Sequence, residues 1–176
     1  DVGCGNGALC GMFRREGLHV VGAEYDRDGY DIARQTYPSI KFYHIGVYDA
    51  PDKILDERGK AFDCVVSTEV VEHLYSPQYL PIFAAQLLRP KGYLVLSTPY
   101  HGYLKNLALS LFDHWDDHHT PLWEGGHIKF WSKKTLRRLL EQNGFSVRSF
   151  YGVGRVPYLW KAMIIVAQKK DELLDS

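Results

Sequence analysis

"DVGCGNGALC", residues 1–10, is the stretch that decides the fold. Glycines stand at positions 3, 5 and 7, and a segment with helical character follows them. Glycine lets a backbone turn sharply at the end of a strand, and because it has no Cβ atom it lets a ligand approach the main chain. The stretch therefore favours a nucleotide-type binding loop. Its spacing fits both a G-x-G-x-G pattern and the G-x-G-x-x-A pattern of dinucleotide binders, so the motif alone leaves the ligand open.

A carboxylate further along the chain supports the same interpretation. Glu24 lies at the end of the strand expected over residues 19–25, seventeen positions after Gly7. From such a strand end, a carboxylate can accept hydrogen bonds from both hydroxyls of a ribose. Taken separately, the glycines also fit an ordinary tight turn, and Glu24 fits a solvated strand end. Taken together, they favour a nucleoside site.

Strands and helices alternate through the first hundred residues. Apolar segments rich in β-branched residues predict strands, and helical spacing predicts the helices between them, one with Ser76 as its N-cap and Pro77 in its first turn. The expected strands cover 19–25, 40–45, 62–68 and 93–98, and the expected helices cover 7–16, 31–36 and 76–88, with a short one in 50–59. Four successive βα-like units predict an α/β fold with a doubly wound, Rossmann-like and mostly parallel sheet.

The pattern changes after residue 99. The expected elements are a helix over 104–111, a loop over 113–126, a helix between Ser132 and Gly144, and strands over 145–153 and 162–169. Leucines at helical spacing in the first of these helices predict that it packs on the core. Ser132 is expected to cap the second helix. The last two strands have no helix between them, so they predict an antiparallel pair that closes the sheet.

Composition narrows the class of protein. A chain of 176 residues suits one domain with a substantial core, and no linker or repeat divides it. The 21 Lys and Arg residues balance 21 Asp and Glu residues, so no basic surface predicts nucleic acid as a partner. No apolar run reaches membrane-spanning length. Three cysteines at no metal-binding spacing indicate a reduced, cytoplasmic protein.

Six segments occur in an order that resembles a known superfamily. They are "DVGCGNG" (1–7), "GAEYD" (22–26), "VYDA" (47–50), "FDCVVSTEVVEHL" (62–74), "LLRPKGYLVLSTP" (87–99) and "GHIKFWSKKTLRRLLEQNGF" (126–145). Together they resemble the successive motifs of class I S-adenosylmethionine-dependent methyltransferases. Within that superfamily they are most similar to the small-molecule branch that includes ubiquinone-biosynthesis O-methyltransferases. The resemblance spans nearly the whole chain.

The resemblance implies S-adenosylmethionine as the cofactor and assigns residues to it. The implied cofactor-binding residues are Asp1, Gly3, Gly5, Gly7, Glu24, Tyr25, Asp49, Thr68 and Glu69. Asp1 and the glycine loop would lie under the methionine and ribose portions, Glu24 would bind the ribose, and Tyr25 would pack near the adenine. Asp49 would meet the adenine amino group, and it fits equally well as the N-cap of the following helix. Residues 68–69 would line the methionine end.

The implied fold needs a strand before the glycine loop. That strand lies at the centre of the sheet, between the strands expected at 19–25 and 62–68. An empty place there would cost about 1–3 kcal/mol for every buried backbone group left without a partner. We therefore expect a single methyltransferase domain over 1–176 whose central first strand is missing from the sequence, so that the domain is incomplete at its N-terminus.

Histidines are the candidate catalytic bases. Methyl transfer from a sulfonium needs alignment and, for a hydroxyl acceptor, a base. Of the eight histidines, we expect His127 in "GHIKFW", and then His101 in "STPYHGY", to touch the acceptor. His73 fits better as a packing or capping residue. Residues 100–131 are expected to form a lid-like insertion over the acceptor pocket.

The segment "DHWDDHHTPLWEGGH" (113–127) contains possible metal ligands. The adjacent His118 and His119 do not easily point the same way, so we predict no metal site and favour an aromatic, polar lid. The sequence thus predicts methyl transfer from S-adenosylmethionine to a small molecule, at oxygen. The alternatives are a nicotinamide-dependent oxidoreductase and a catalytically silent cofactor-binding protein.

Overall fold

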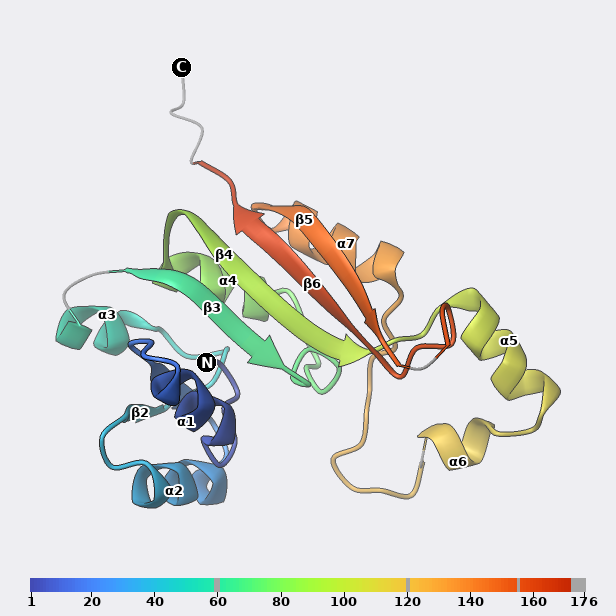
Figure 1. Ribbon diagram of the computed structural model, residues 1–176, viewed down its shortest axis with the longest axis horizontal. Coiled ribbons are helices and arrows are strands. Elements are labelled where there is room, and N and C mark those ends of the chain that lie inside the picture. Colours follow the sequence, from blue (N-terminus) through green and yellow to red (C-terminus); the bar gives the residue numbers. More distant parts are fainter. Residues whose placement is uncertain (59–60, 120, 155, 172–176) are drawn as a thin grey trace.

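The computed structural model describes residues 1–58, 61–119, 121–154 and 156–171, and strands and helices alternate through its first half (Figure 1). The elements are α1 (Ala8–Arg15), β1 (Val21–Glu24), α2 (Arg27–Thr36), β2 (Lys41–His44), α3 (Asp52–Arg58), β3 (Phe62–Thr68), α4 (Tyr79–Leu87), β4 (Leu88–Pro99), α5 (Tyr103–Leu111), α6 (Trp115–His119), α7 (Lys133–Gln142), β5 (Phe145–Val153) and β6 (Ala162–Lys169). The strands expected at 62–68, 145–153 and 162–169 are confirmed with the same bounds. Among these described residues, no helix is both long enough and apolar enough to cross a membrane.

The strands pair in parallel in the first half of the chain and antiparallel in the last part. β1 pairs in parallel with β2, and β3 pairs in parallel with β4. β6 lies between β4 and β5 and is antiparallel to both. This confirms the predicted antiparallel pair, and it shows that β6 is the strand that joins the pair to the parallel part.

Residues 1–3 connect the two groups of strands. The backbone N–H of Val2 donates to the carbonyl of Val66 in β3 at 2.8 Å. On the other side, the N–H of Gly3 donates to the carbonyl of Ala23 in β1, also at 2.8 Å. A parallel bridge joins Val2 and Ala23. The glycine loop therefore starts at the centre of the sheet, between β1 and β3, where the sequence predicted the central strand.

Helices cover both faces of the sheet beside β2. Neighbouring residues of a strand point to opposite faces. Phe42 packs with Cys10 of α1 and Ala33 of α2 in one buried cluster. Tyr43 belongs to a second, larger cluster, which includes Ile54 of α3. Because α1 and α2 lie on one face and α3 on the other, the predicted doubly wound arrangement is confirmed.

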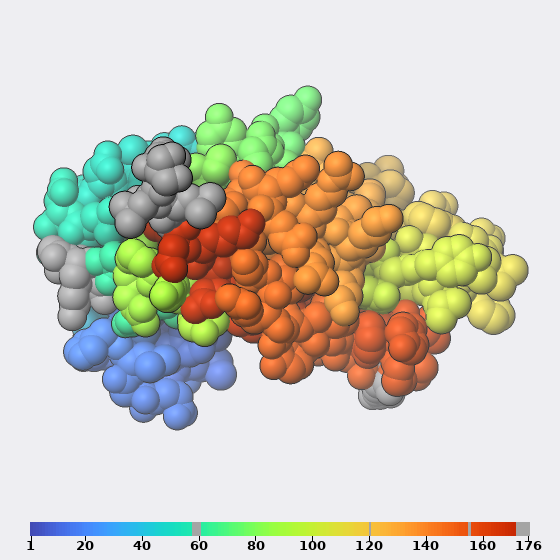
Figure 2. All heavy atoms as spheres, turned by 90° about the horizontal axis from the view of Figure 1, so that it is seen from above, coloured from blue at the N-terminus to red at the C-terminus, as the bar shows by residue number. Residues whose placement is uncertain are grey.

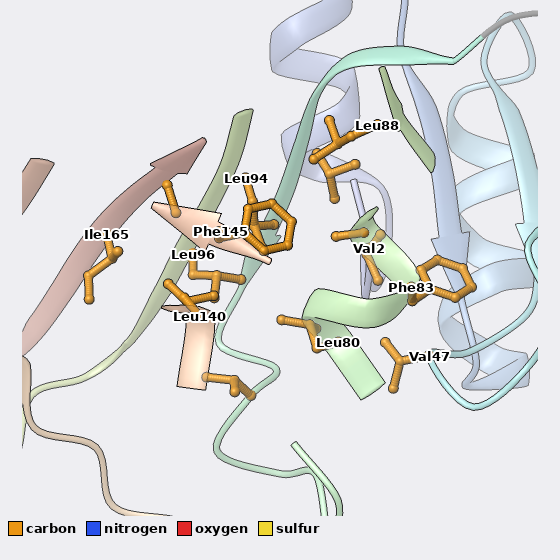
Figure 3. Packing of buried hydrophobic residues seen from close by; sticks show 14 of the residues in the cluster. Val2, Val47, Leu80, Phe83, Leu88, Leu94, Leu96, Leu140, Phe145 and Ile165 are labelled. Carbon is orange, nitrogen blue, oxygen red and sulfur yellow. The ribbon is translucent and has the colours of Figure 1, made fainter. Parts of the chain in front are cut away.

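The larger cluster is the main core (Figure 3). Its most buried members include Leu80 and Phe83 from α4, Leu94 and Leu96 from β4, Leu140 from α7, Phe145 from β5 and Ile165 from β6. Fully burying a side chain of this size contributes about 1.5–3 kcal/mol. The core therefore fixes α4 and α7 to the sheet, behind β4 and β5 in the view of Figure 1.

Helix α4 begins later than predicted. Its N-cap is Gln78, and no side chain caps it, so the prediction that Ser76 is the N-cap is wrong. The backbone N–H of Tyr79 instead donates to the carbonyl of Ser76, three residues back, at 3.2 Å. A hydrogen bond of this span forms a tight 3₁₀-type turn. This turn takes the place of the capped first turn of the helix.

The face of helix α5 that packs against the protein is the opposite of the predicted face. Leu104, Leu107 and Leu111 are 49%, 40% and 71% exposed, so the prediction that they pack on the core is wrong. The buried residue of α5 is Lys105, which is only 7% exposed. The helix lies at one end of the molecule, away from the main core (Figures 1 and 2), so the core does not cover its leucines.

Residues 100–131, the predicted lid-like insertion, contain α5 and α6. Helix α6 lies within the stretch that the sequence predicted as a loop. Thr120, which belongs to the same stretch, lies outside the described residues. The insertion follows β4 and therefore leaves the sheet at the carboxyl-terminal end of that strand (Figure 1).

Ser132 provides a test of the predicted helix cap, which is confirmed. Its Oγ accepts a hydrogen bond from the N–H of Thr135 at 3.3 Å, and Thr135 Oγ1 accepts one from the N–H of Ser132 at 3.0 Å. Ser132→Ala removes an acceptor from this capping box and should lower the free energy of unfolding by about 0.5–2 kcal/mol. Urea unfolding followed by circular dichroism measures the loss. Ser132→Thr keeps a hydroxyl as a control, and an equal loss in both variants would contradict the capping role.

Candidate functional site

A cavity of about 560 Å³ lies at the carboxyl-terminal ends of β1, β2 and β3. Its wall comes from residues 2–3 of the glycine loop, residues 24–25, residues 45–49 and several residues between 69 and 74. Open α/β sheets bind ligands at this edge, and small-molecule sites usually measure about 300–1,000 Å³. The cavity therefore has both the position and the size of a ligand site.

The carboxylate of Glu24 links the end of β1 to the glycine loop. Its Oε2 accepts a hydrogen bond from the backbone N–H of Gly5 at 2.6 Å, and its Oε1 accepts one from the N–H of Asp26 at 2.8 Å. Two hydrogen bonds fix the orientation of the group at the cavity wall. A carboxylate oxygen has a second acceptor position, so each oxygen can still accept a hydrogen bond from a ligand hydroxyl. The pairing of glycine loop and carboxylate that the sequence predicted is present.

The glycine loop needs glycine for two different reasons. Gly3 has a φ of 72°, and a Cβ atom there would overlap Cγ2 of Val70, which follows β3. Gly5 has a φ of 52°, but a Cβ atom would have no other atom within 4 Å. Gly3 thus lets the loop pack closely against the end of β3, whereas Gly5 leaves open space beside Glu24. A ligand can approach the main chain there.

Tyr25 and Asp49 line the cavity just after β1 and β2. A Cβ atom on Gly46 would lie 3.1 Å from Cβ of Tyr25, so the tyrosine packs directly against that glycine. The Asp49 carboxylate accepts a hydrogen bond from the N–H of Gly46 at 2.7 Å. It therefore closes the turn after β2 and does not cap α3, which begins at Asp52. Asp49 was predicted either to meet the adenine or to cap this helix, and only its position at the cavity agrees with the structure.

The structure brings some of the predicted residues to the cavity and leaves others outside it. Gly3, Glu24, Tyr25, Asp49 and Glu69 line it, and Asp1, Gly5, Gly7, Thr68, His101 and His127 do not. Gly5 adjoins the wall through its hydrogen bond to Glu24. The carboxylate of Asp1 faces α1 instead, where Sγ of Cys10 lies 3.4 Å from its Oδ2.

Two carboxylates follow β3 at the other end of the cavity. Glu69 has a positive φ of 54°, and its Oε1 accepts a hydrogen bond from Ser97 Oγ at 2.7 Å. Glu72 is 1% exposed; its Oε2 accepts one from Thr98 Oγ1 at 2.9 Å, and its Oε1 has no partner. Burial, and then the charge of Glu69, raise the pKa of Glu72 to about 7. Glu69 lines the cavity and Glu72 does not. We call this pair of carboxylates the acidic end of the site.

His73 and His127 meet beside these carboxylates. Their ring centroids are 4.9 Å apart, and His73 lines the cavity. One ligand atom each from Glu72, His73 and His127 lies within 4.8 Å of the others, and a carboxylate with two imidazoles is chemically able to hold a divalent cation. Burial, and then His73, lower the pKa of His127. The absence of a metal, which the sequence predicted, stays a prediction.

His101 lies in a separate group of aromatic side chains. It is 7% exposed, and its ring contacts those of His118, His119 and Phe130. Burial, and then Lys105, lower its pKa to about 4. The expectation that the adjacent His118 and His119 point apart is wrong, because both rings lie against His101.

Glu72 was not among the predicted site residues, and His73 was predicted to pack or to cap a helix. The signal was present in "TEVVEHL" (68–74), where a second carboxylate and a histidine follow Glu69 within one helical turn. Lys105 was missed as well, because a lysine among leucines on a helix is ordinarily exposed.

Comparison with known proteins agrees with this geometry. The family described as "Methyltransferase domain" matches residues 1–149. A protein of Ruegeria sp. (strain TM1040) named "Ubiquinone biosynthesis O-methyltransferase" is 31% identical over 170 residues, which cover 92% of this chain and 65% of that protein. The chain spans 44% to 65% of the length of curated relatives with this name.

Solved structures show the same fold. A crystal structure of a SAM-dependent methyltransferase from Methanosarcina mazei has a TM-score of 0.75 at 17% identity and covers 98% of this chain and 92% of that one. Magnesium protoporphyrin IX methyltransferase from Synechocystis PCC 6803, crystallised with bound SAH, has a TM-score of 0.70 at 18% identity and covers 97% and 73%. Because the family match extends over residues 1–149 and the fold agrees with it, the chain belongs to the methyltransferase-domain family of class I S-adenosylmethionine-dependent methyltransferases.

Proposed function

We propose that this protein transfers a methyl group from S-adenosylmethionine to an oxygen atom of a small molecule. The observation that carries the proposal is the Glu24 carboxylate, which the N–H of Gly5 holds at the wall of a cavity of about 560 Å³. A carboxylate fixed in this way suits the two hydroxyls of a ribose. The relative named ubiquinone biosynthesis O-methyltransferase supports oxygen as the atom that is methylated.

The cavity residues fit the parts of S-adenosylmethionine. Glu24 would bind the ribose, while the ring of Tyr25 and the carboxylate of Asp49, which also line the cavity, would bind the adenine. Gly3 and the residues just after β3, beginning with Glu69, would hold the methionine end. When bound, the cofactor supplies a methyl group on a positively charged sulfur. The protein then has to orient the acceptor, exclude water and take up a proton.

His127 is the proposed base for the acceptor hydroxyl. Its ring contacts His73, which lines the cavity, so it stands next to the methionine end. Because burial and His73 lower its pKa, its imidazole is neutral near pH 7 and can accept a proton. His101 remains the second candidate. With a pKa of about 4, it holds a proton poorly, which makes it the weaker base.

A reducing, cytoplasmic compartment is part of the proposal. Cys4, Cys10 and Cys64 are all free thiols. Free thiols persist in reducing compartments, where disulfides are rare.

Two alternatives predict different binding and turnover. A nicotinamide-dependent oxidoreductase would bind a dinucleotide, and a catalytically silent protein would bind the cofactor without methylating any acceptor. The family match favours a methyltransferase over the oxidoreductase. Calorimetry with S-adenosylhomocysteine and with NAD tests the first alternative. Turnover of labelled S-adenosylmethionine with a panel of hydroxyl-bearing small molecules tests the second.

Glu24→Ala should weaken the binding of S-adenosylhomocysteine by about 1–3 kcal/mol, because it removes two charge-assisted hydrogen bonds to the ribose. Isothermal titration calorimetry measures the change. Glu16→Ala removes an exposed carboxylate at the end of α1 and serves as the matched control. Circular dichroism verifies that both variants are folded. An unchanged affinity in a folded Glu24→Ala protein would remove Glu24 from the site.

His127→Gln should lower kcat about 10²- to 10⁴-fold on a hydroxyl acceptor, because the proposed base for the hydroxyl proton is then lost. Its affinity for S-adenosylhomocysteine should stay near that of the unmodified protein. Release of S-adenosylhomocysteine measures turnover on the acceptor panel. His19→Gln, at an exposed position, is the control. An equal kcat in the two variants would show that His127 is not the base.

A further inference from the structure

Helix α5 buries a lysine and exposes its leucines. Lys105 is 7% exposed, and its Nζ has no hydrogen-bond partner in the structure, whereas Leu104 and Leu107 on the same helix are 49% and 40% exposed. Lysine is almost never buried unless it is paired, since removing an ammonium group from water is costly. Apolar burial alone would select the opposite face of this helix. A departure of this kind from local rules is expected at functional sites.

Three imidazoles surround the same region. The ring centroid of His101 lies 5.6 Å from that of His118 and 5.5 Å from that of His119. Nε2 of His101 and Nε2 of His119 are buried and have no hydrogen-bond partner. Phe130 borders the group, with its ring 5.0 Å from His101 and 4.8 Å from His119. We call Lys105, His101, His118 and His119 the lysine–histidine cluster.

The charges that act on the lysine–histidine cluster are positive. Burial, and then Lys161, lower the pKa of Lys105. Burial, and then Lys105, lower the pKa values of His101 and His118, each to about 4. Within the described residues, no carboxylate forms an ion pair with these four side chains. The ammonium group of Lys105 would repel a bound cation and would pair with an anion.

The start of α5 adds to this preference for an anion. The N-cap of the helix is Gly102, which follows His101 directly, and no side chain caps the helix. Lys105 belongs to the first turn. The uncapped N–H groups of a first turn, together with the helix dipole, favour negative charge. Lys105 Nζ, the Nε2 atoms of His101 and His119, and the start of α5 can thus donate hydrogen bonds to an anion.

We propose that the lysine–histidine cluster is an oxyanion-binding subsite, which takes a carboxylate or phosphate group. Phe130, which borders the cluster, follows His127 by three residues. Three residues of chain span at most about 11 Å. The subsite therefore lies within reach of a small molecule whose hydroxyl is at His127. An oxyanion on the methyl acceptor is its ligand, and this identification rests on the proposed function.

The dependence of Tm on anions tests the subsite without any methyl acceptor. Inorganic phosphate and benzoate are added to the protein, with sodium chloride at equal ionic strength and benzyl alcohol as the neutral match for benzoate. A ligand that binds only the folded state raises Tm, by about 2–4 °C once its concentration is about five times its dissociation constant. We expect phosphate or benzoate to do so, and benzyl alcohol to have no effect.

Lys105→Met should abolish this rise, and it should raise the Tm in chloride alone because a buried, unpaired charge is lost. Lys134→Met removes an exposed lysine on α7 and should respond to anions as the unmodified protein does. This control also corrects for general stabilisation by salts. If Lys105→Met does not fold, His101→Gln provides the same comparison, with a weakened response expected.

The outcomes distinguish the source of the oxyanion. A response to benzoate that is lost in Lys105→Met supports an acceptor carboxylate, and a response to phosphate alone identifies a phosphate site. An unresponsive protein, or a Lys105→Met variant that responds like Lys134→Met, would overturn the subsite. Calorimetry with S-adenosylhomocysteine is run in parallel. If S-adenosylhomocysteine does not bind, the proposed function is wrong. The response of Tm to anions then still decides whether the subsite exists.

Discussion

The hydrogen bonds of residues 1–3 to β1 and β3 are the constraint on which the site depends. Val2 is 5% exposed and bonds to β3, while Gly3 bonds to β1, so three residues join two groups of strands. This pairing places the carboxyl-terminal ends of β1 and β3 on either side of the glycine loop. Glu24 and Glu69 then stand at one edge of the sheet, and the cavity forms between them. A pairing that slipped by one residue would turn Val2 out of the core.

The sequence predicted the sheet well because its strands carry a strong local signal. β3, β5 and β6 are apolar stretches bounded by turn residues, and their bounds were predicted to the residue. Ser132 was recognised as a cap because its hydrogen bond joins it to Thr135, three residues away. Ser76 failed as a cap because a cap and a 3₁₀ turn share the same residue types. The orientation of α5 failed because periodicity shows that a helix has an apolar face, but it does not show that the face is covered.

The two halves of the site also differ in how far a local sequence pattern predicts them. The pairing of Gly5 with Glu24 could be predicted. In this type of sheet the end of β1 lies next to the glycine loop that follows the central strand. The contact of His73 with His127 joins residues 54 positions apart, and it depends on the path of an insertion that no local pattern specifies. The lysine–histidine cluster likewise gathers residues from the start of α5 and from α6. Tertiary contacts determine both the His73–His127 contact and the lysine–histidine cluster.

The acidic end of the cavity and the lysine–histidine cluster are connected by one segment of backbone. The carbonyl of Glu72 accepts hydrogen bonds from the N–H groups of Ile128 and Lys129, both at 3.0 Å. These bonds tie the last part of the insertion to the turn after β3, with His127 before them and Phe130 behind them. Glu72 and Lys105 each keep a buried polar atom without a hydrogen-bond partner. Polar atoms of this kind are costly to bury, so stability alone does not explain them. Under the proposed function, this segment would separate the residues for the cofactor, which the sheet positions, from the residues for the acceptor, which the insertion positions.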